Sequence, residues 1–258
     1  MADLVAVESV TKVFPTLAGD TTVALDDVSL AIAADEFVTV VGPSGCGKST
    51  LLKLIAGIVE PTRGRVVVRG RPRAGPRRDI GMVFQSPVLM PWRSVLDNVL
   101  FPVEMLRLPV REYRAEAQRL LDLVGLSGFE RSYPRELSGG MQQRVSICRA
   151  LIYDPQLLLM DEPFGALDAL TREEIGLQLL RVWQERRKTV VFVTHSIPEA
   201  VLLADRVVVL AARPGRVVRT IEVKLPRPRT LEMETWAEFG GYAAAIREGI
   251  APARAADR

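Results

Sequence analysis

The stretch VGPSGCGKST, from Val41 to Thr50, decides how the rest of this chain is organised. An apolar run from Phe37 to Val41 precedes it and predicts a buried strand, and Leu51 to Ile55 follows and predicts a helix. The residues that match the spacing G-x-x-x-x-G-K-[ST] are Gly42, Gly47, Lys48 and Ser49. A chance glycine turn is the alternative, but it does not account for an ordered match between a strand and a helix.

The chemistry of this stretch is anion binding. Glycines let backbone N–H groups turn toward phosphate oxygens, and the following helix points its positive dipole end at them. Lys48 can reach β- and γ-phosphates, and the Ser49 hydroxyl can ligate Mg²⁺. The residues predicted to contact nucleotide here are Gly42, Pro43, Ser44, Gly45, Cys46, Gly47, Lys48, Ser49 and Thr50.

Composition narrows the class of protein. The chain has 258 residues, 48% of them hydrophobic, so a large core is available and global disorder is excluded. A net charge of +3 is a mild excess, and we predict no nucleic-acid partner. Cys46 and Cys148 give no disulfide framework, which predicts a reduced cytosolic compartment. No apolar run approaches the about 18 residues of a membrane span, and the first residues do not form a secretory signal.

The regions flanking this loop predict short strands. Leu4 to Val7 and Val28 to Ile32 alternate apolar and polar residues around a turn at Gly19-Asp20. From position alone Phe14 is a strand-end aromatic. Pro61 to Gly64 is predicted to end the helix after the loop, and a strand follows.

Residues 86 to about 155 predict a helical insertion. Ile80 to Phe84 reads as a buried strand ending at Gln85, and Pro87, Pro91 and Pro102 then predict a loop region. Glu112 to Val124 predicts a helix.

A second helix start lies in LSGGMQQR, residues 137 to 144. Ser138 sits at the N-cap, and Gly139 and Gly140 leave backbone N–H groups unshielded. We predict a second phosphate contact, with an ordinary Ser/Gly helix start as the alternative.

Two adjacent carboxylates end the next buried strand. Leu157 to Met160 is continuously apolar, as in a parallel sheet covered on both faces, and Asp161 and Glu162 follow it. Ligands of open α/β sheets bind at this end of the strands. Asp161 can hold Mg²⁺ and Glu162 can take a proton from an attacking water. An exposed acidic turn before Pro163 is the alternative.

The C-terminal third predicts two more strand–helix units. Thr171 with Glu174 predicts a capping box for a helix to about Arg187, and Ser196 with Glu199 predicts another through Leu203. His195, the single histidine, follows a buried strand and is interpreted as a γ-phosphate contact rather than a structural residue. Strands are then expected at residues 207–210 and 217–223 around a Pro214-Gly215 turn, and a short helix near residues 236–246.

Taken in order, these motifs resemble the ATP-binding cassette subunit of ABC transporters over about residues 4 to 225. The resemblance makes residues 42–50 the Walker A loop, Gln85 the Q-loop, residues 137–144 the signature and residues 157–162 the Walker B strand with its glutamate. It makes Ala166-Leu167-Asp168 the D-loop, His195 the switch histidine and Phe14 the aromatic that stacks on adenine. Ser196 and Met141 depart from the commonest family residues without putting activity in doubt.

The resemblance implies an α/β fold, a P-loop NTPase (RecA-like) core with an antiparallel β subdomain and an inserted α-helical subdomain at about 86–155. The nucleotide-binding domain would cover 1–225 and a C-terminal tail 226–258. The implied catalytic residues are Glu162, His195, Gln85 and Lys48; further ATP contacts are Phe14, Ser138, Gly139, Gly140 and Asp168; Mg²⁺ ligands are Ser49, Gln85 and Asp161.

The family also implies partners. Two copies pair head to tail, a separate membrane permease docks on them, and a solute-binding protein completes the transporter at the cytoplasmic face of a bacterial inner membrane. Residues 90–99, 213–218 and 225–229 resemble the nitrate/sulfonate/taurine importer branch. The alternatives are a cassette ATPase acting on ribosomes or nucleic acid, and a non-hydrolysing regulatory module; one cassette per chain and the presence of Glu162 and His195 argue against them.

Overall fold

The computed structural model describes residues 3–16, 19–72, 75, 78–165, 167–185 and 187–255. The chain folds into two compact units. Unit 1 consists of Met1–Arg77 and Lys188–Arg258, and unit 2 is Arg78–Arg187. The predicted site residues are therefore divided between two parts of the fold.

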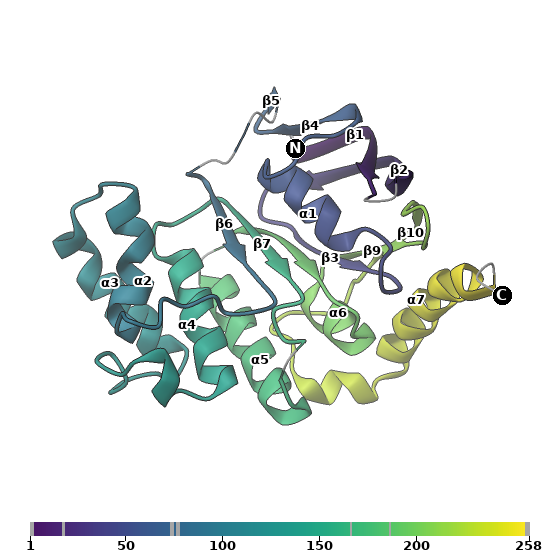
Figure 1. Ribbon diagram of the computed structural model, residues 1–258. Helices are drawn as coiled ribbons and strands as arrows, with labels where there is room; N and C mark the ends of the chain where they lie inside the picture. The colour runs from purple at the N-terminus through teal and green to yellow at the C-terminus, as the bar shows by residue number, and fades with distance from the viewer. Residues whose placement is uncertain are drawn as a thin grey trace. The chain divides into compact units, whose positions relative to one another are not determined.

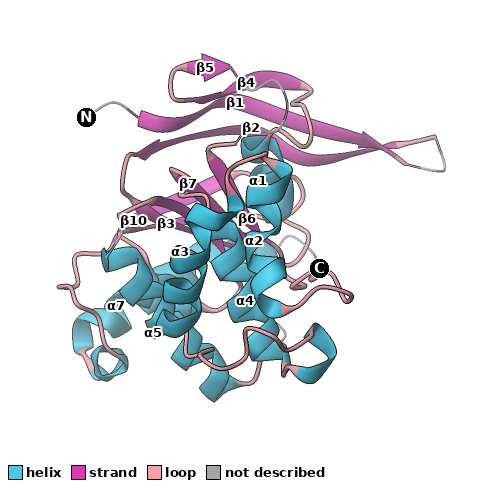
Figure 2. Cartoon of the chain, turned by 90° about the vertical axis from the view of Figure 1, so that its left-hand side faces the viewer, coloured by secondary structure: helices cyan, strands magenta, loops and turns pink. Residues whose placement is uncertain are grey.

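Unit 1 contains an antiparallel sheet, shown as a layer of strands in Figure 2. Its strands are β1 (Asp3–Pro15), β2 (Thr21–Ala33), β4 (Arg63–Val68) and β5 (Arg71–Pro72), in the order β2-β1-β4-β5. Apolar residues alternate along β1, so that Val5, Val7 and Val10 are buried while intervening residues are not. The predicted strands at 4–7 and 28–32 are confirmed, although both run further than the alternation indicated.

Unit 1 also contains parallel strands that carry the phosphate loop. β3 (Phe37–Val41) pairs in parallel with β8 (Thr189–Val193) and β9 (Arg206–Leu210), and β10 (Val217–Glu222) pairs antiparallel with β9. Every residue of β3 and β8 is buried, which explains why both are apolar apart from one threonine each, Thr39 and Thr189. α1 (Lys48–Ala56) follows β3, and α6 (Ile197–Leu203) follows β8.

The predicted end of α1 is wrong. The helix stops at Ala56, before Pro61, because Gly57 adopts a left-handed conformation with φ of 72°. Its N–H donates to the Leu54 carbonyl, which closes the last turn.

The segment after residue 225 packs on other elements of unit 1, to which it belongs. It forms a 3₁₀ turn, η2 (Leu231–Thr235), and α7 (Ala237–Ala255), which is longer than the predicted short helix. Phe239, Ala243 and Ile246 are buried, and α7 packs on α6 and β9 (Figure 1). The domain boundary at residue 225 stays a prediction.

Arg229 anchors this segment to the end of α6. The residue is 4% exposed, and its guanidinium donates to the carbonyls of Val201, Leu202 and Ala204, at 2.6–3.1 Å, and to those of Val223 and Leu225. A cation at a helix C-terminus satisfies the last carbonyls and opposes the negative dipole end. Burial lowers the pKa of Arg229 to about 10.

Unit 2 combines a parallel strand pair with helices. β6 (Ile80–Val83) pairs with β7 (Leu157–Asp161), and the helices are α2 (Val95–Met105), α3 (Val110–Leu123), α4 (Gly139–Leu151) and α5 (Ala169–Glu185), with a 3₁₀ turn η1 (Pro134–Glu136). α2, α3 and α4 lie together in Figure 1 and pack on one another. This arrangement agrees with the expected helical insertion.

α2 was not expected, because the prolines indicated a loop. Its N-cap Ser94 accepts a hydrogen bond from the Asp97 N–H, and Val95, Val99 and Val103 are buried. Proline costs a helix a hydrogen bond and a clash, but the apolar face packs well enough to offset Pro102.

Two predicted capping boxes need correction. Thr171 lies inside α5, and Asp168 is the cap, accepting hydrogen bonds from the Thr171 N–H at 3.0 Å and its hydroxyl at 2.7 Å. Ser196 does cap α6, but Glu199 turns to the Thr194 hydroxyl instead of completing the box. In both cases a carboxylate, of Asp168 or of Glu199, accepts a hydrogen bond from a threonine hydroxyl that the spacing of the motif did not identify.

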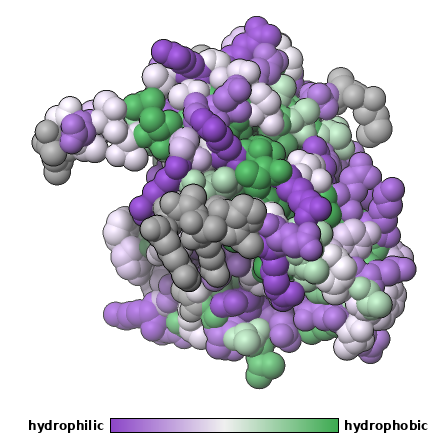
Figure 3. Space-filling model, turned by 90° about the vertical axis from the view of Figure 1, so that its right-hand side faces the viewer, coloured by the Kyte–Doolittle hydropathy of each residue, from purple (hydrophilic) through white to green (hydrophobic). Residues whose placement is uncertain are grey.

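The face shown in Figure 3 is mostly hydrophilic, with hydrophobic residues in separate patches. Among the residues that the structure describes, none of the helices combines the length and apolarity that crossing a bilayer requires.

Candidate functional site

The phosphate loop in unit 1 is held by close backbone contacts. A Cβ added to Gly42 would lie 2.6 Å from the Leu210 carbonyl oxygen, and one added to Gly47 would lie 2.7 Å from the Ala24 oxygen. Gly47 also has φ of 89°, so it is required both by conformation and by space. The loop can therefore hold its backbone close to neighbouring strands while α1 begins directly after it.

Lys48 is buried inside this loop. The residue is 6% exposed, and its Nζ donates to the carbonyl oxygens of Gly42 at 3.0 Å and Pro43 at 3.1 Å. A buried ammonium group is costly without acceptors, and the loop carbonyls accept hydrogen bonds from it. Ser49 and Thr50 follow on the first turn of α1, both half-buried.

The other predicted residues of unit 1 are His195 and Phe14. His195 is exposed after β8, and its backbone is fixed on the C-terminal side by the Ser196 N–H, which donates to Thr194 Oγ1 at 2.9 Å. Phe14 is half-buried near the end of β1, with Lys12 Nζ 4.9 Å from its ring centroid. A cation already lies over this ring, as expected of an electron-rich aromatic face.

Unit 2 brings Gln85 close to the Walker B turn. Asp161 ends β7, and Glu162 follows it in a left-handed conformation with φ of 43°. A Cβ placed on Gly165 would lie 3.4 Å from Gln85 Nε2 and 3.3 Å from the Glu162 carbonyl oxygen. Uncommon backbone conformations of this kind persist at functional sites when the surrounding structure enforces them.

Sequence reasoning missed two residues that hold the segment around Gln85. The buried amide of Gln143 donates to the Phe84 carbonyl at 3.2 Å. Arg149 donates to the carbonyls of Pro87 and Val88, each at 2.7 Å, and its burial lowers its pKa. Both lie on α4, which the signature begins, so this helix ties the signature to the Q-loop. Polar residues between apolar ones in its sequence are the signal that was available.

The signature starts α4 as predicted. The Ser138 hydroxyl accepts a hydrogen bond from the Met141 N–H at 3.3 Å, and Ser138 and Gly139 are exposed. Gly140 is buried, and a Cβ there would lie 2.7 Å from Thr171 Cγ2. In the D-loop, Ala166 lies outside the described residues. Asp168 is exposed, and its hydrogen bonds from Thr171 lower its pKa.

A family model described as ABC transporter matches residues 25–165 of this chain. The chain belongs to the ABC transporter family. It is 53% identical to a taurine import ATP-binding protein, TauB, of Burkholderia thailandensis over 76% of this chain and 75% of that protein. It is 42% identical to an aliphatic sulfonates import ATP-binding protein, SsuB, of Bacillus cereus over 91% and 92%.

A solved structure gives the same answer for the fold. A dimeric, post-hydrolysis ATP-binding cassette bound to ADP and Pi has a TM-score of 0.73 and 34% identity, and it covers 86% of this chain and 100% of that one. The predicted family, the α/β P-loop NTPase fold class and the ATPase class are confirmed by these matches. The individual site residues stay predictions.

The chemistry of the predicted Mg²⁺ donors fits the ion. Ser49 in unit 1 and Gln85 and Asp161 in unit 2 supply a hydroxyl, an amide and a carboxylate oxygen, and Mg²⁺ takes oxygen ligands. In the described part of the chain no group of three His, Cys, Asp or Glu side chains is placed to hold a metal. Mg²⁺ sites in proteins commonly use one or two carboxylates together with waters and substrate phosphates.

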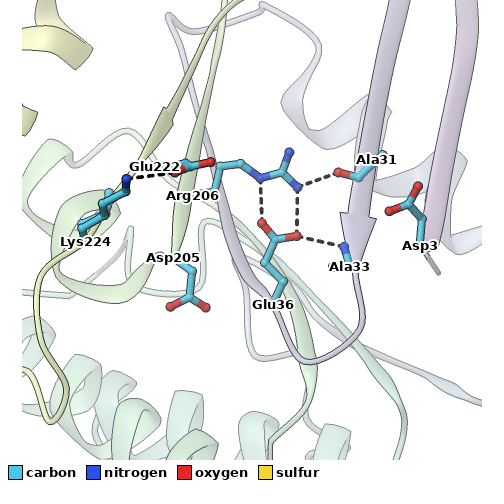
Figure 4. Close-up of a pocket in the computed structure, with 9 residues that line it drawn as sticks. Asp3, Ala31, Ala33, Glu36, Asp205, Arg206, Glu222 and Lys224 are labelled. Atoms are coloured by element: carbon cyan, nitrogen blue, oxygen red, sulfur yellow. Dashed lines mark hydrogen bonds and ion pairs between the residues drawn. The ribbon is translucent and has the colours of Figure 1, made fainter. Parts of the chain in front are cut away.

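A hollow on unit 1 is lined by other residues of the ABC cassette (Figure 4). Arg206 lies across it and pairs with both carboxylate oxygens of Glu36, at 2.6 and 2.9 Å, while Glu222 faces Lys224. These charges compensate one another, and none of the predicted site residues lines this hollow.

Proposed function

We propose that this chain is the ATP-hydrolysing subunit of a bacterial importer that takes up a small sulfonate, taurine or a related anion. Support for the solute class comes from the taurine and sulfonate import relatives and from residues 90–99 and 213–218. The observation that carries the ATPase part is Lys48, a buried cation surrounded by loop carbonyls at the start of α1.

Binding would use two helix starts. Lys48 would exchange its Gly42 and Pro43 carbonyls for β- and γ-phosphate oxygens, with the glycine backbone of the loop donating to the same phosphates. Phe14 would stack on adenine through its aromatic face. Ser138, Gly139 and Gly140 would contact the nucleotide of a second copy, paired head to tail, with Asp168 at that interface.

Hydrolysis would depend on residues of unit 2 and on His195. Glu162 would accept the proton of the attacking water, Gln85 would orient that water, and His195 would hydrogen-bond the γ-phosphate. Mg²⁺, held by Ser49, Gln85 and Asp161, would neutralise phosphate charge. Contacts of Gln143 and Arg149 with the backbone of residues 84–88 would keep Gln85 in place.

The importer would require partners that a cassette alone does not supply. These are a membrane permease, which we expect to dock near residues 86–105, and a solute-binding protein. The chain would then work at the cytoplasmic face of the bacterial inner membrane as a peripheral subunit.

Co-purification from native membranes tests this proposal. The tagged chain is isolated in mild detergent, and its companions are identified by mass spectrometry; Lys48→Ala protein serves as a control that keeps the docking surface. We expect a multi-span permease, and a solute-binding protein from the same transporter that binds taurine, an alkanesulfonate or nitrate. Recovery with ribosomes or nucleic acid and no permease would overturn the transport assignment.

A further inference from the structure

The turn between β9 and β10 is packed against the phosphate loop. Gly215 lies so close that a Cβ added to it would sit 2.1 Å from the Cys46 carbonyl oxygen and 2.9 Å from that of Ala24. Real Cβ atoms do not approach a carbonyl oxygen so closely, so any other residue would displace Cys46, two residues before Lys48.

Conformation is not the reason for glycine at this position. Gly215 has no positive φ, whereas Gly45 and Gly47 in the loop have φ of 77° and 89°. Alanine could adopt the backbone of residue 215, and only the space occupied by Cys46 and Ala24 excludes it. Substitution here therefore tests a contact and not backbone strain.

Hydrogen bonds and an ion pair hold the turn in place. The Gly215 N–H donates to the Ala24 carbonyl at 3.1 Å, and the Asp26 N–H donates to the Gly215 carbonyl at 2.9 Å. The Arg216 guanidinium pairs with the Asp26 carboxylate, with Nε 3.1 Å from Oδ2. Leu25, between these β2 residues, is fully buried and lies 2.6 Å from the position of a Cβ on Gly47.

We propose that this turn, residues 213–216, is a brace that sets the position of the phosphate loop, with Gly215 and the Asp26–Arg216 pair as positioning residues for nucleotide binding. The turn contacts the loop at Cys46, and β2 contacts it at Gly47. The two residues that precede Lys48 are therefore each held by a neighbouring segment. The inference rests on the proposed ATP site and gives a role to part of residues 213–218, which resemble importers of the nitrate/sulfonate/taurine branch.

The test compares Gly215→Ala with Gly240→Ala, a glycine of unit 1 whose added Cβ meets nothing within 4 Å. Affinity for a fluorescent ATP analogue is measured by titration, and melting temperature is measured with and without ATP. We expect Gly215→Ala to weaken ATP binding by about 10- to 100-fold, because misplacing a binding group by about 1 Å has effects of this size. The clash with the backbone should also lower its melting temperature without ATP, and the further stabilisation that ATP gives the wild type should be lost. The Gly240→Ala protein should bind as the wild type does.

A second pair of variants protects the test against misfolding. Arg216→Ala removes an exposed partner and should weaken ATP binding by only about two- to fivefold, since surface ion pairs are weak. The exchanged pair Asp26→Arg with Arg216→Asp should restore part of that loss. Wild-type affinity in both Gly215→Ala and Arg216→Ala, in a protein whose wild type binds ATP, would overturn the brace. Absence of ATP binding by the wild type would instead overturn the proposed function.

Discussion

The two helix starts that we assign to phosphate differ in how much of each is completed within one chain. Gly42, Cys46 and Lys48 of the phosphate loop are buried, and close contacts at Gly42 and Gly47 hold the loop in place, while Ser44 and Gly45 at its tip are exposed. The signature start is exposed, and Ser138 already caps its own helix. One site is finished by intrachain packing, whereas the other presents its polar groups outward.

This difference indicates that the phosphate loop governs the affinity of one chain for ATP, whereas the signature acts when two copies pair. The loop places its cation at the start of α1, where a phosphate of the nucleotide bound to its own chain would lie. The exposed start of α4 is already capped by Ser138 within its own chain, and it is therefore suited to contact a nucleotide that is bound to another copy. The difference therefore predicts that loop substitutions weaken ATP binding strongly, while signature substitutions leave binding unchanged and lower the rate of hydrolysis.

Lys48→Ala should have the largest effect. Loss of a charge-assisted contact to phosphate should weaken ATP affinity on the order of 100-fold. Lys53→Ala, on the exposed side of α1, is the matched control and should bind normally. Titration of a fluorescent nucleotide checks both, and unchanged affinity in Lys48→Ala would remove the distinction between the two helix starts.

Gly139→Arg should affect hydrolysis without affecting binding. Nothing lies within 4 Å of a Cβ at Gly139, so the fold of one copy should tolerate the change. Blocking the donors of the signature should lower the ATPase rate about 100-fold, a loss typical of removing transition-state hydrogen bonds. Gly241→Arg, also in open space, is the control. A normal rate in Gly139→Arg would mean that the signature contacts no nucleotide.

Gly140→Ala should instead destabilise unit 2. A Cβ would meet Thr171 Cγ2 at 2.7 Å, and overpacking of this kind costs about 1–3 kcal/mol. Thr171→Ser removes the methyl group and keeps the hydroxyl bond to Asp168, so the double variant should regain most of the lost stability. Denaturant unfolding measures the free energies; equal losses in the single and double variants would show that this methyl contact is not the cause.

A pH effect at Asp168 should be the smallest. Its pKa is lowered because it accepts hydrogen bonds from Thr171, so the ionised carboxylate stabilises the fold. That contribution is present above its ordinary pKa of 3.8 and is lost as the pH falls through the lowered value. Asp168→Asn keeps an N-cap acceptor and should lose this dependence. Identical acid-unfolding profiles would contradict the assignment.

The sequence predicted the elements whose signals are local. Apolar runs located β3, β7 and β8, and the glycine and serine motifs located the starts of α1 and α4. α2 was missed because Pro102 outweighed a helical pattern that only packing could support. Gly57 was missed as the end of α1 because the sequence alone does not show which glycines adopt a left-handed conformation.

The residue types of the site could be predicted from the sequence, but the residues that hold the site in position could not. Lys48, Ser138 and Glu162 stand in motifs with fixed spacing. The contacts of Gln143 and Arg149 with residues 84–88 span about 60 positions, and no local pattern pairs residues over such a distance. Arg229 and the Gly215 contact with Cys46 belong to the same class, since each depends on which segments the fold places side by side.

The central claim is that the phosphate loop of one copy and the signature of another form one ATP site. Sedimentation velocity of the Glu162→Gln protein, which should bind ATP and fail to hydrolyse it, tests this most directly. We predict a dimer with ATP, a monomer with ADP, and a monomer with ATP when Gly139→Arg is added to Glu162→Gln. A dimer that forms equally well in the double variant, or a Glu162→Gln protein that stays monomeric at saturating ATP, would contradict the account.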